Sequence, residues 1–160
     1  MDRKLMEEML TRMKLHLLKG EDIGNLKVGA LFALGEQLSA IFYYVGHELG
    51  SKIEIENGPI TEIGQIIAKF IEITQQYHLG EIIIDEQDNG HITFHLADCN
   101  SCKDLPVATP SDNSFCSFEA GVFAGIVERM SNKRCFAQEL ECRLQGRASH
   151  CQFMIVIPTD

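Results

Sequence analysis

Six cysteines in a chain of 160 residues most strongly restrict how this sequence can fold. Cysteines at this density serve as small buried side chains, as disulfides or as metal ligands. Zinc prefers four soft or borderline ligands in a tetrahedron, and a carboxylate can replace one thiolate. The spacing in the last third of the chain therefore suggests a metal-stapled domain. One closed site could be supplied by Cys116, Glu139, Cys142 and Cys151.

Disulfides are the main alternative, and they require an oxidising compartment. The N-terminal stretch MDRKLMEEMLTRMKLHLL mixes Asp2, Glu7 and Glu8 with its apolar residues and has no small-residue cleavage site. It is therefore unlike a signal peptide. We expect a cytoplasmic protein whose thiols stay reduced, which favours a metal over disulfides.

The other two cysteine patterns are less specific. Cys135 lies within a β-like run and is expected to be a core residue. Cys99 and Cys102 form a C-x2-C pair, which suits a redox pair, half of a zinc site or a loop with two exposed thiols.

Composition sets the class of protein. A mass of 18.0 kDa and 45% hydrophobic residues suit a single domain over residues 1–160. The net charge of −9 repels phosphate backbones and anionic lipid, so we expect no direct nucleic-acid binding. The apolar stretches are interrupted by polar residues or are too short to cross a bilayer, so no membrane span is expected.

Apolar periodicity predicts three helices before the first strand. They cover residues 4–18, which precede Lys19-Gly20, residues 27–49, and a segment that opens at Thr61 and stops at Leu79-Gly80. The first helix carries a stripe of methionine and leucine. Such a stripe suits docking on a partner subunit as well as packing on its own domain.

The rest of the chain alternates strands, a helix and strands. Residues 81–87 and 91–97 are β-type runs joined by Asp88-Asn89-Gly90, which is typical of a tight hairpin turn. The remaining predicted elements are a loop at 100–114, a helix at 115–130 and strands at 134–144 and 152–157. This order indicates an α+β fold with an antiparallel sheet.

Two motifs in the last third carry a family resemblance. The first is C-x2-E-x-G-x3-G from Cys116, and the second is E-x2-C-x3-G-x4-C-x-F from Glu139. With the DCNSC stretch just before them, they make residues 95–153 a metal-binding signature region that resembles the 4-vinyl reductase domain family, in particular its stand-alone archaeal members. The resemblance implies the fold of haem-nitric-oxide-binding domains and vesicle-tethering small subunits. In that fold a twisted antiparallel sheet has helices packed on one side, and the molecule is commonly a dimer.

The resemblance also implies a ligand set. The zinc ligands of related phenol-responsive sensory domains fall on Cys116, Glu139, Cys142 and Cys151. A regular strand would point Glu139 and Cys142 to opposite faces, so this assignment requires a bulge or bend near Leu140. The second-ranked set replaces two of the ligands, and it consists of Cys99, Cys102, Cys142 and Cys151.

Glycines four residues apart in the last predicted helix, Gly121 and Gly125, permit close approach of another backbone, and packing is the favoured interpretation. The alternative is space for a ligand between helix and sheet. The aromatic candidates for lining such a pocket are Phe32, Tyr43, Tyr44 and Phe123. Aromatic residues at helical spacing are more often plain core. Among the histidines, His150 is of interest because it adjoins Cys151.

The patterns favour a binding module over an enzyme. The sequence contains no G-x-G-x-x-G turn, no P-loop and no recognisable nucleophile elbow. We expect a zinc-stapled sensor or binding module, without catalysis, that takes up a small hydrophobic or aromatic molecule. We further expect a homodimer to which the helix within residues 1–20 contributes. The alternatives are an auxiliary enzyme in tetrapyrrole vinyl reduction and a protein-interaction scaffold.

Overall fold

The structure is a computed structural model that describes residues 11, 14–20, 27, 38–55, 59–88, 90–107 and 115–158. The helices in this part of the chain are α3 (Leu38–Ser51), α4 (Ile63–Gln76) and α5 (Ser117–Ser131), with a short 3-10 helix, η1 (Arg143–Gln145). The strands are β1 (Glu81–Gln87), β2 (His91–Ala97), β3 (Phe136–Glu141) and β4 (Cys151–Val156). The predicted α+β fold is confirmed.

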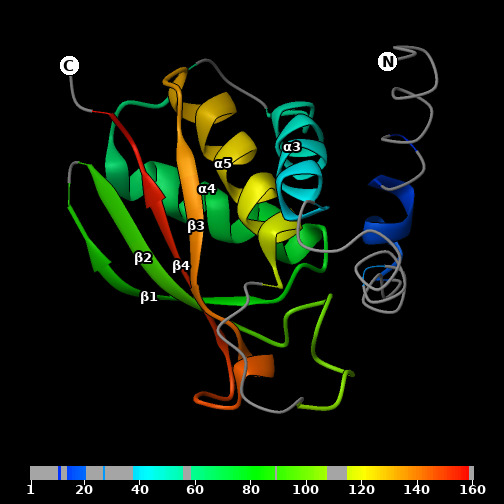
Figure 1. The fold of residues 1–160 in the computed structure, drawn as a ribbon. Coiled ribbons are helices and arrows are strands. Elements are labelled where there is room, and N and C mark those ends of the chain that lie inside the picture. The colour runs from blue at the N-terminus through cyan, green and yellow to red at the C-terminus, as the bar shows by residue number, and fades with distance from the viewer. Residues whose placement is uncertain are drawn as a thin grey trace.

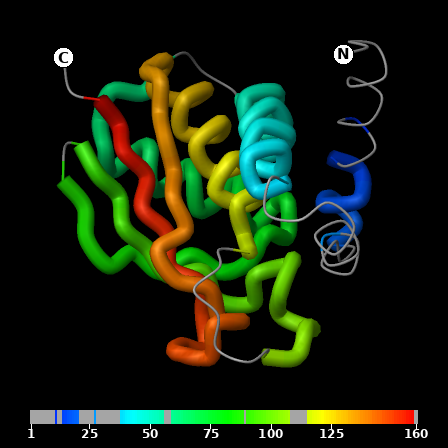
Figure 2. The backbone as a smooth tube through the Cα atoms, viewed as in Figure 1, coloured from blue at the N-terminus to red at the C-terminus, as the bar shows by residue number. Residues whose placement is uncertain are grey.

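The four strands form one twisted antiparallel sheet in the order β1-β2-β4-β3. The described helices α3, α4 and α5 lie on one side of it (Figure 1), and the smooth backbone trace shows the same layering (Figure 2). The loop after β2 and the η1 segment both extend from the same end of the sheet. Residues far apart in the sequence therefore meet at this end.

Phenyl rings fill the space between the helices and the sheet. Neighbouring rings lie with centroids 5.2 to 5.6 Å apart, mostly edge to face, which is a favourable geometry for aromatic pairs. These fully buried rings belong to Phe70, Phe94, Phe123 and Phe153.

The helices α3 and α5 are in backbone contact. A Cβ atom added at Gly121 would lie 2.0 Å from the carbonyl oxygen of Tyr43, and one at Gly125 would lie 2.3 Å from that of His47. No real Cβ tolerates such distances, so the absence of side chains is what lets the helices touch. The packing interpretation of these glycines is confirmed.

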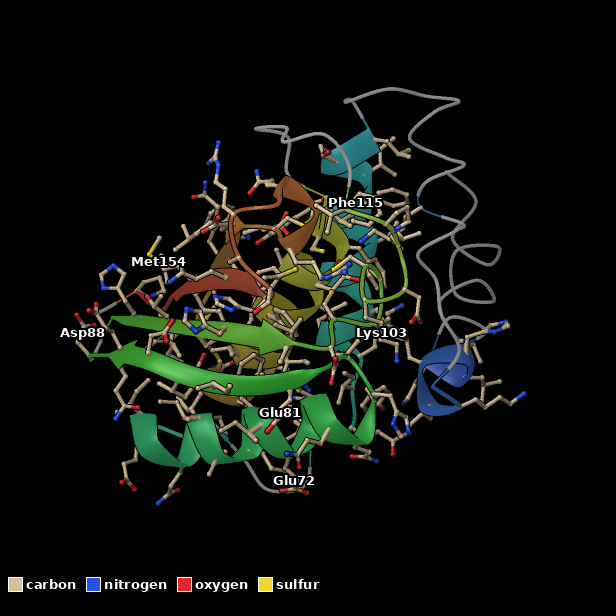
Figure 3. All side chains as sticks on the ribbon, turned by 90° about the horizontal axis from the view of Figure 1, so that it is seen from below. Glu72, Glu81, Asp88, Lys103, Phe115 and Met154 are labelled. Carbon is tan, nitrogen blue, oxygen red and sulfur yellow. The ribbon has the colours of Figure 1, made fainter. Side chains whose placement is uncertain are left out.

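The β1–β2 hairpin closes as its turn sequence predicts. Asp88 Oδ1 accepts hydrogen bonds from the backbone amides of Gly90 and His91, both at 2.7 Å. These bonds lower the pKa of Asp88. Asp88 lies at the far end of the hairpin from Lys103 and Phe115 (Figure 3), so the turn is remote from the cysteine-rich end.

Some predicted boundaries differ from the structure. The strand expected at 134–144 is β3 alone, because the Cys142 amide donates to Gln145 Oε1 at 2.9 Å and the chain enters η1 instead of continuing the ladder. Residues 14–18 are helical and precede a turn at 19–20, as predicted for the first helix. Apart from Thr11, the earlier part of that helix lies outside the described residues, as do residues 28–37 of the second.

None of the helices in the described ranges has the length and apolar character needed to cross a bilayer.

Candidate metal centre

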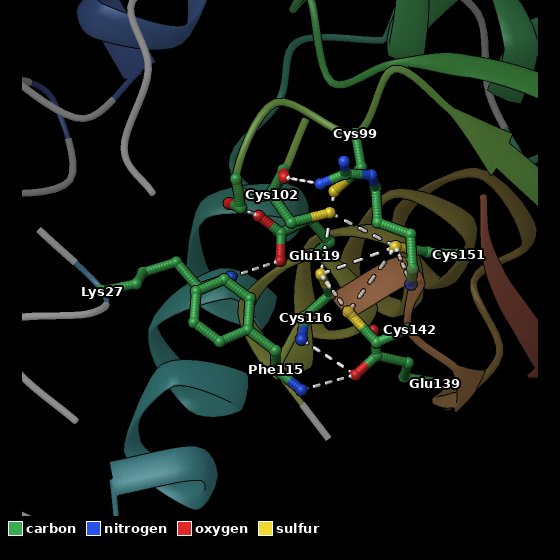
Figure 4. Close-up of polar contacts among 11 residues, drawn as sticks. Lys27, Cys99, Cys102, Phe115, Cys116, Glu119, Glu139, Cys142 and Cys151 are labelled. Carbon is green, nitrogen blue, oxygen red and sulfur yellow. Dashed lines mark hydrogen bonds and ion pairs between the residues drawn. The ribbon is translucent and has the colours of Figure 1, made fainter. Parts of the chain in front are cut away.

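The cysteine-rich end of the sheet gathers thiols from four segments (Figure 4). The loop after β2 supplies two, the residue before α5 supplies one, and the end of β3 and the start of β4 supply one each. Every one of these side chains is at most 1% exposed. The cysteine cluster, as we call it, consists of Cys99, Cys102, Cys116, Cys142 and Cys151.

The Sγ–Sγ distances in the cysteine cluster suit thiolates that share a metal. An ideal tetrahedron with Zn–S bonds of about 2.3 Å has edges of about 3.8 Å. The cluster shows 3.7 Å from Cys99 to Cys116, 3.4 Å from Cys102 to Cys151, and 3.8 or 3.9 Å among Cys116, Cys142 and Cys151. All six cysteines of the chain are free, so no disulfide competes.

The donors fall into two overlapping groups, in each of which the ligand atoms lie within 4.8 Å of one another. The Glu139 group consists of Cys116, Glu139, Cys142 and Cys151. The Cys99 group consists of Cys99, Cys102, Cys116 and Cys151. The first group brings together the four residues ranked first from the sequence. The second differs from the second-ranked set because Cys116 takes the place of Cys142.

A β-bulge delivers Glu139 to the cluster. Glu139 pairs with Phe153 and Glu141 with Gln152, so Leu140 is an extra residue without a partner on β4. The bulge predicted near Leu140 is confirmed. It places Glu139 and Cys142 on the same side of the chain, which a regular strand would not do.

The Glu139 carboxylate also holds the start of α5. Its Oε2 accepts hydrogen bonds from the backbone amides of Phe115 and Cys116, both at 2.8 Å. Cys116 is the N-cap of α5, where the helix dipole favours negative charge. Both the carboxylate and a Cys116 thiolate are thus stabilised at this helix end.

Backbone and side-chain donors fix the segment around Cys151 and the loop after β2. The Arg143 amide donates to Cys151 Sγ at 3.5 Å. The Arg143 guanidinium donates to the carbonyls of Cys102 and Leu105, the latter at 2.9 Å. Gly146 adopts a φ of 77°, which lets the chain turn back toward β4 after η1. These contacts position the thiols from two separate segments.

The thiols of the cluster differ in acidity. Hydrogen bonds from neighbouring thiols lower the pKa of Cys99 and of Cys142. Burial raises the pKa of Cys116. Some thiolate character is therefore present in the cluster itself, and thiolate is the form that binds a metal.

A buried ion pair next to the cluster was not predicted from the sequence. Lys27 Nζ lies 2.7 Å from Glu119 Oε2, and Nζ is also 4.6 Å from the centroid of the Phe115 ring. Ser101 Oγ donates to the other oxygen of Glu119. The signal that could have found the pair is Glu119 itself, since an acidic residue in an otherwise apolar helix requires a buried partner.

Opposing effects set the pKa values of this pair. Burial by itself lowers the pKa of Lys27, but the negative charge of Glu119 outweighs it, so the pKa of Lys27 lies above its usual value. Burial raises the pKa of Glu119, and Lys27 counteracts part of that rise.

The aromatic residues proposed for a ligand pocket do not gather around one space. Phe123 is packed in the ring cluster of the core, whereas Tyr44 is 49% exposed. The Tyr43 hydroxyl accepts a hydrogen bond from the Ala137 amide at 3.1 Å. Phe32 lies outside the described residues.

Two further residues considered from the sequence also have clear positions. The His150 ring stacks on His95 with a centroid distance of 3.9 Å, and His150 belongs to neither donor group. Cys135 is buried away from the cluster beside Ser131, so the expectation of a core cysteine is confirmed.

Comparison with known proteins agrees with the fold and the motifs. Residues 92–157 match the model of the 4-vinyl reductase domain family. Two uncharacterised proteins of the archaeon Methanocaldococcus jannaschii are related in sequence. MJ0150 is 27% identical over 82% of this chain and 72% of its own length, and MJ1642 is 30% identical over 76% of this chain. This chain spans 66% of the length of MJ1642.

Solved structures share the fold at low sequence identity. The phenol-responsive sensory domain of the transcription activator PoxR, with phenol, is 19% identical, with a TM-score of 0.65 over 90% of this chain and 75% of that domain. A vinyl-4-reductase family protein from M. jannaschii has a TM-score of 0.59 at 19% identity, covering 99% of this chain and 98% of its own. Trafficking protein particle complex subunit 3 from Naegleria fowleri, covalently bound to palmitic acid, has a TM-score of 0.61 at 11% identity, covering 93% and 96%. With the matched domain, the archaeal relatives and the shared fold, this chain belongs to the 4-vinyl reductase domain family.

Proposed function

We propose that this domain is a small-molecule sensor or binding module that zinc holds together and that carries out no reaction. The observation that carries the proposal is the closed set of buried donors in the cysteine cluster. Each donor group supplies four ligand atoms from the protein, all from buried residues. A zinc ion with four protein ligands has no open position for water or substrate, which is typical of a structural site and not of a catalytic one.

The proposed zinc has a clear structural task. Its ligands come from the start of α5, the loop after β2 and the ends of β3 and β4. One ion would join segments that otherwise meet only through hydrogen bonds, and ligation energy becomes folding energy. We take the Glu139 group as the first ligand set. Reduced, metal-bound thiols suit the cytoplasm.

The ligand part of the proposal is supported by the shared fold of a sensory domain described as phenol-responsive. We propose an apolar or aromatic small molecule as the ligand here. Tyr43 and Tyr44 on α3 are only partly covered and can meet a ligand without a change in the core. Phe123 can reach one only if the ring cluster of Phe70, Phe94 and Phe153 opens.

We also propose a homodimer that uses the N-terminal helix. In the described part of this helix, Leu17 is buried in the core while Leu15 is 53% exposed. The helix is therefore fixed to its own domain by one face and offers a second apolar face to a partner. Light scattering of the full chain and of a chain that lacks residues 1–19 tests this, because loss of the helix should weaken association.

A thermal-shift screen of phenols, fatty acids and tetrapyrroles tests the proposed function. A ligand that binds only the folded state raises the melting temperature with the logarithm of its concentration. Tyr44→Ala should reduce the shift, whereas His91→Ala, on a strand at the other side of the sheet, should not. A parallel assay with nicotinamide cofactors and a vinyl-bearing tetrapyrrole should show no turnover, and cofactor-dependent reduction would overturn the proposal in favour of an enzyme.

A protein-interaction scaffold is the second candidate, and the filled aromatic core favours it. Ring centroids 5.2 to 5.6 Å apart leave the interior around Phe123 closely packed. Exposed Ile41 and Tyr44 on α3 and Phe136 on β3 offer apolar surface instead. If no compound shifts the melting temperature and no turnover is found, this second function takes precedence.

A further inference from the structure

The two donor groups of the cysteine cluster lie on either side of one shared pair of thiols. Cys116 and Cys151, whose Sγ atoms are 3.9 Å apart, belong to both groups. Cys99 and Cys102 belong only to one group, and Glu139 and Cys142 belong only to the other. Two coordination tetrahedra that share an edge have this arrangement of donors.

We propose that the cysteine cluster binds two divalent, thiol-preferring ions, with the thiolates of Cys116 and Cys151 as shared bridging ligands. Cys99 and Cys102 complete the tetrahedron of one ion. Glu139 and Cys142 complete the tetrahedron of the other. The inference rests on the metal-binding part of the proposed function and extends it from one ion to a binuclear centre.

A single ion would leave two good metal donors beside it. With one ion in the Glu139 group, Cys99 and Cys102 would remain as buried thiols with Sγ atoms 3.7 and 3.4 Å from liganding thiolates. With one ion in the Cys99 group, Cys142 would stay 3.8 Å from each bridging sulfur. Two ions use all six donors. Zinc accepts thiolate and carboxylate ligands in such tetrahedra.

The charge around the cluster also suits two ions. Five thiolates and one carboxylate carry more negative charge than one divalent ion can offset, and buried charge is costly. Two ions offset most of it. The remainder meets the ammonium of Lys27, which interacts with the charges of Cys99 and Cys116, and the N-terminus of α5 at Cys116. The Arg143 amide donates to the bridging sulfur of Cys151 at 3.5 Å.

Metal stoichiometry tests the proposal directly. The full chain is purified without oxygen, and zinc per chain is measured by plasma mass spectrometry against protein quantified by amino-acid analysis. We expect about two zinc ions per chain, one for each tetrahedron. Replacement with cadmium-113 should give two NMR signals joined by scalar coupling, because the bridging sulfurs connect the two ions. Two uncoupled signals would overturn the shared ligands.

Three variants separate this inference from the one-ion function. Cys99→Ser with Cys102→Ser should halve the metal content, because the Glu139 group stays intact. Cys116→Ser should lower the affinity for both ions, because it removes a shared ligand. Cys135→Ser removes a buried thiol outside the cluster and should change nothing.

The outcomes are distinguishable. About one zinc per chain in the wild type, unchanged by the double variant, would overturn the second ion and leave the one-ion function standing. No bound metal in a folded chain would overturn both. Iron with acid-labile sulfide in place of zinc would overturn the thiolate-bridged centre.

Discussion

Lys27 Nζ lies 2.7 Å from Glu119 Oε2, and the two side chains are only 2% and 1% exposed. Removal of one partner from a buried ion pair typically costs about 3–5 kcal/mol, because it leaves a buried charge without its counter-charge. We expect Lys27→Met to destabilise the fold by about that amount. We expect Lys27→Met with Glu119→Gln to recover much of the loss. Urea unfolding of the single and double variants measures both.

The same pair predicts a pH dependence. Burial raises the pKa of Glu119 above its ordinary value of 4.5, and Lys27 counteracts that rise. A carboxyl group with a raised folded-state pKa favours folding at low pH, and this contribution is lost as the pH rises through the folded-state pKa. Loss of Lys27 raises this pKa further. The defect of Lys27→Met relative to the double variant should therefore be largest at neutral pH and shrink toward pH 4.5. A constant defect would contradict the assignment.

The backbone contact between α3 and α5 predicts opposite effects of two glycine substitutions. Gly121→Ala would place a Cβ 2.0 Å from the Tyr43 carbonyl oxygen and push the helices apart, so we expect a loss of about 1–3 kcal/mol. Gly64→Ala on α4 is the matched control. Its Cβ meets only the end of the Glu62 side chain, at 3.6 Å, and a gain of up to about 1 kcal/mol follows from helix propensity. Thermal unfolding of the two variants compares them, and equal effects would refute the contact.

The bulge at Leu140 predicts that this residue can be deleted without loss of the metal site. Leu140 has no partner on β4 and is 45% exposed. Its deletion leaves Glu139 and Cys142 two residues apart, which keeps them on one face of a regular strand. Insertion of an alanine after Leu140 should instead turn Cys142 away and reduce metal content. Metal content of the two purified variants decides the matter, and loss in the deletion alone would contradict the role given to the bulge.

Thiol reactivity provides a prediction for metal removal. Metal-bound and buried, the cysteine cluster should react slowly with a disulfide reagent, and a chelator should expose its thiols as the local structure loosens. The melting temperature should fall at the same time, because ligation energy is folding energy. The Cys142→Ser variant should start closer to the chelated state. Unchanged reactivity and stability after chelation would argue against a structural metal.

Much of the fold was predictable because its signals are local. The hairpin follows from Asp88-Asn89-Gly90, and its two strands have the predicted bounds. The bulge at Leu140 was predictable because Glu139 and Cys142 have to face one way. The end of β3 was not, because the turn into η1 depends on a hydrogen bond from the Cys142 amide to the Gln145 side chain.

The candidate site was predictable only in part, for reasons of distance along the chain. The residues of the Glu139 group follow from motif spacing, but the convergence of Cys99 and Cys102 on the same sulfurs depends on how the loop after β2 folds back. Lys27 is 92 residues from Glu119, and no local pattern connects them. The aromatic candidates share helical spacing but not one space, because α3 presents Tyr44 to solvent while α5 presents Phe123 to the core.

X-ray absorption at the zinc edge of the anaerobically purified protein tests the central claim most directly, because it reports the ligand atoms themselves. The structure predicts a first shell dominated by sulfur at about 2.3 Å, with a smaller oxygen contribution from Glu139. A shell of nitrogen and oxygen alone at about 2.0–2.1 Å, or a folded protein without metal, would contradict it.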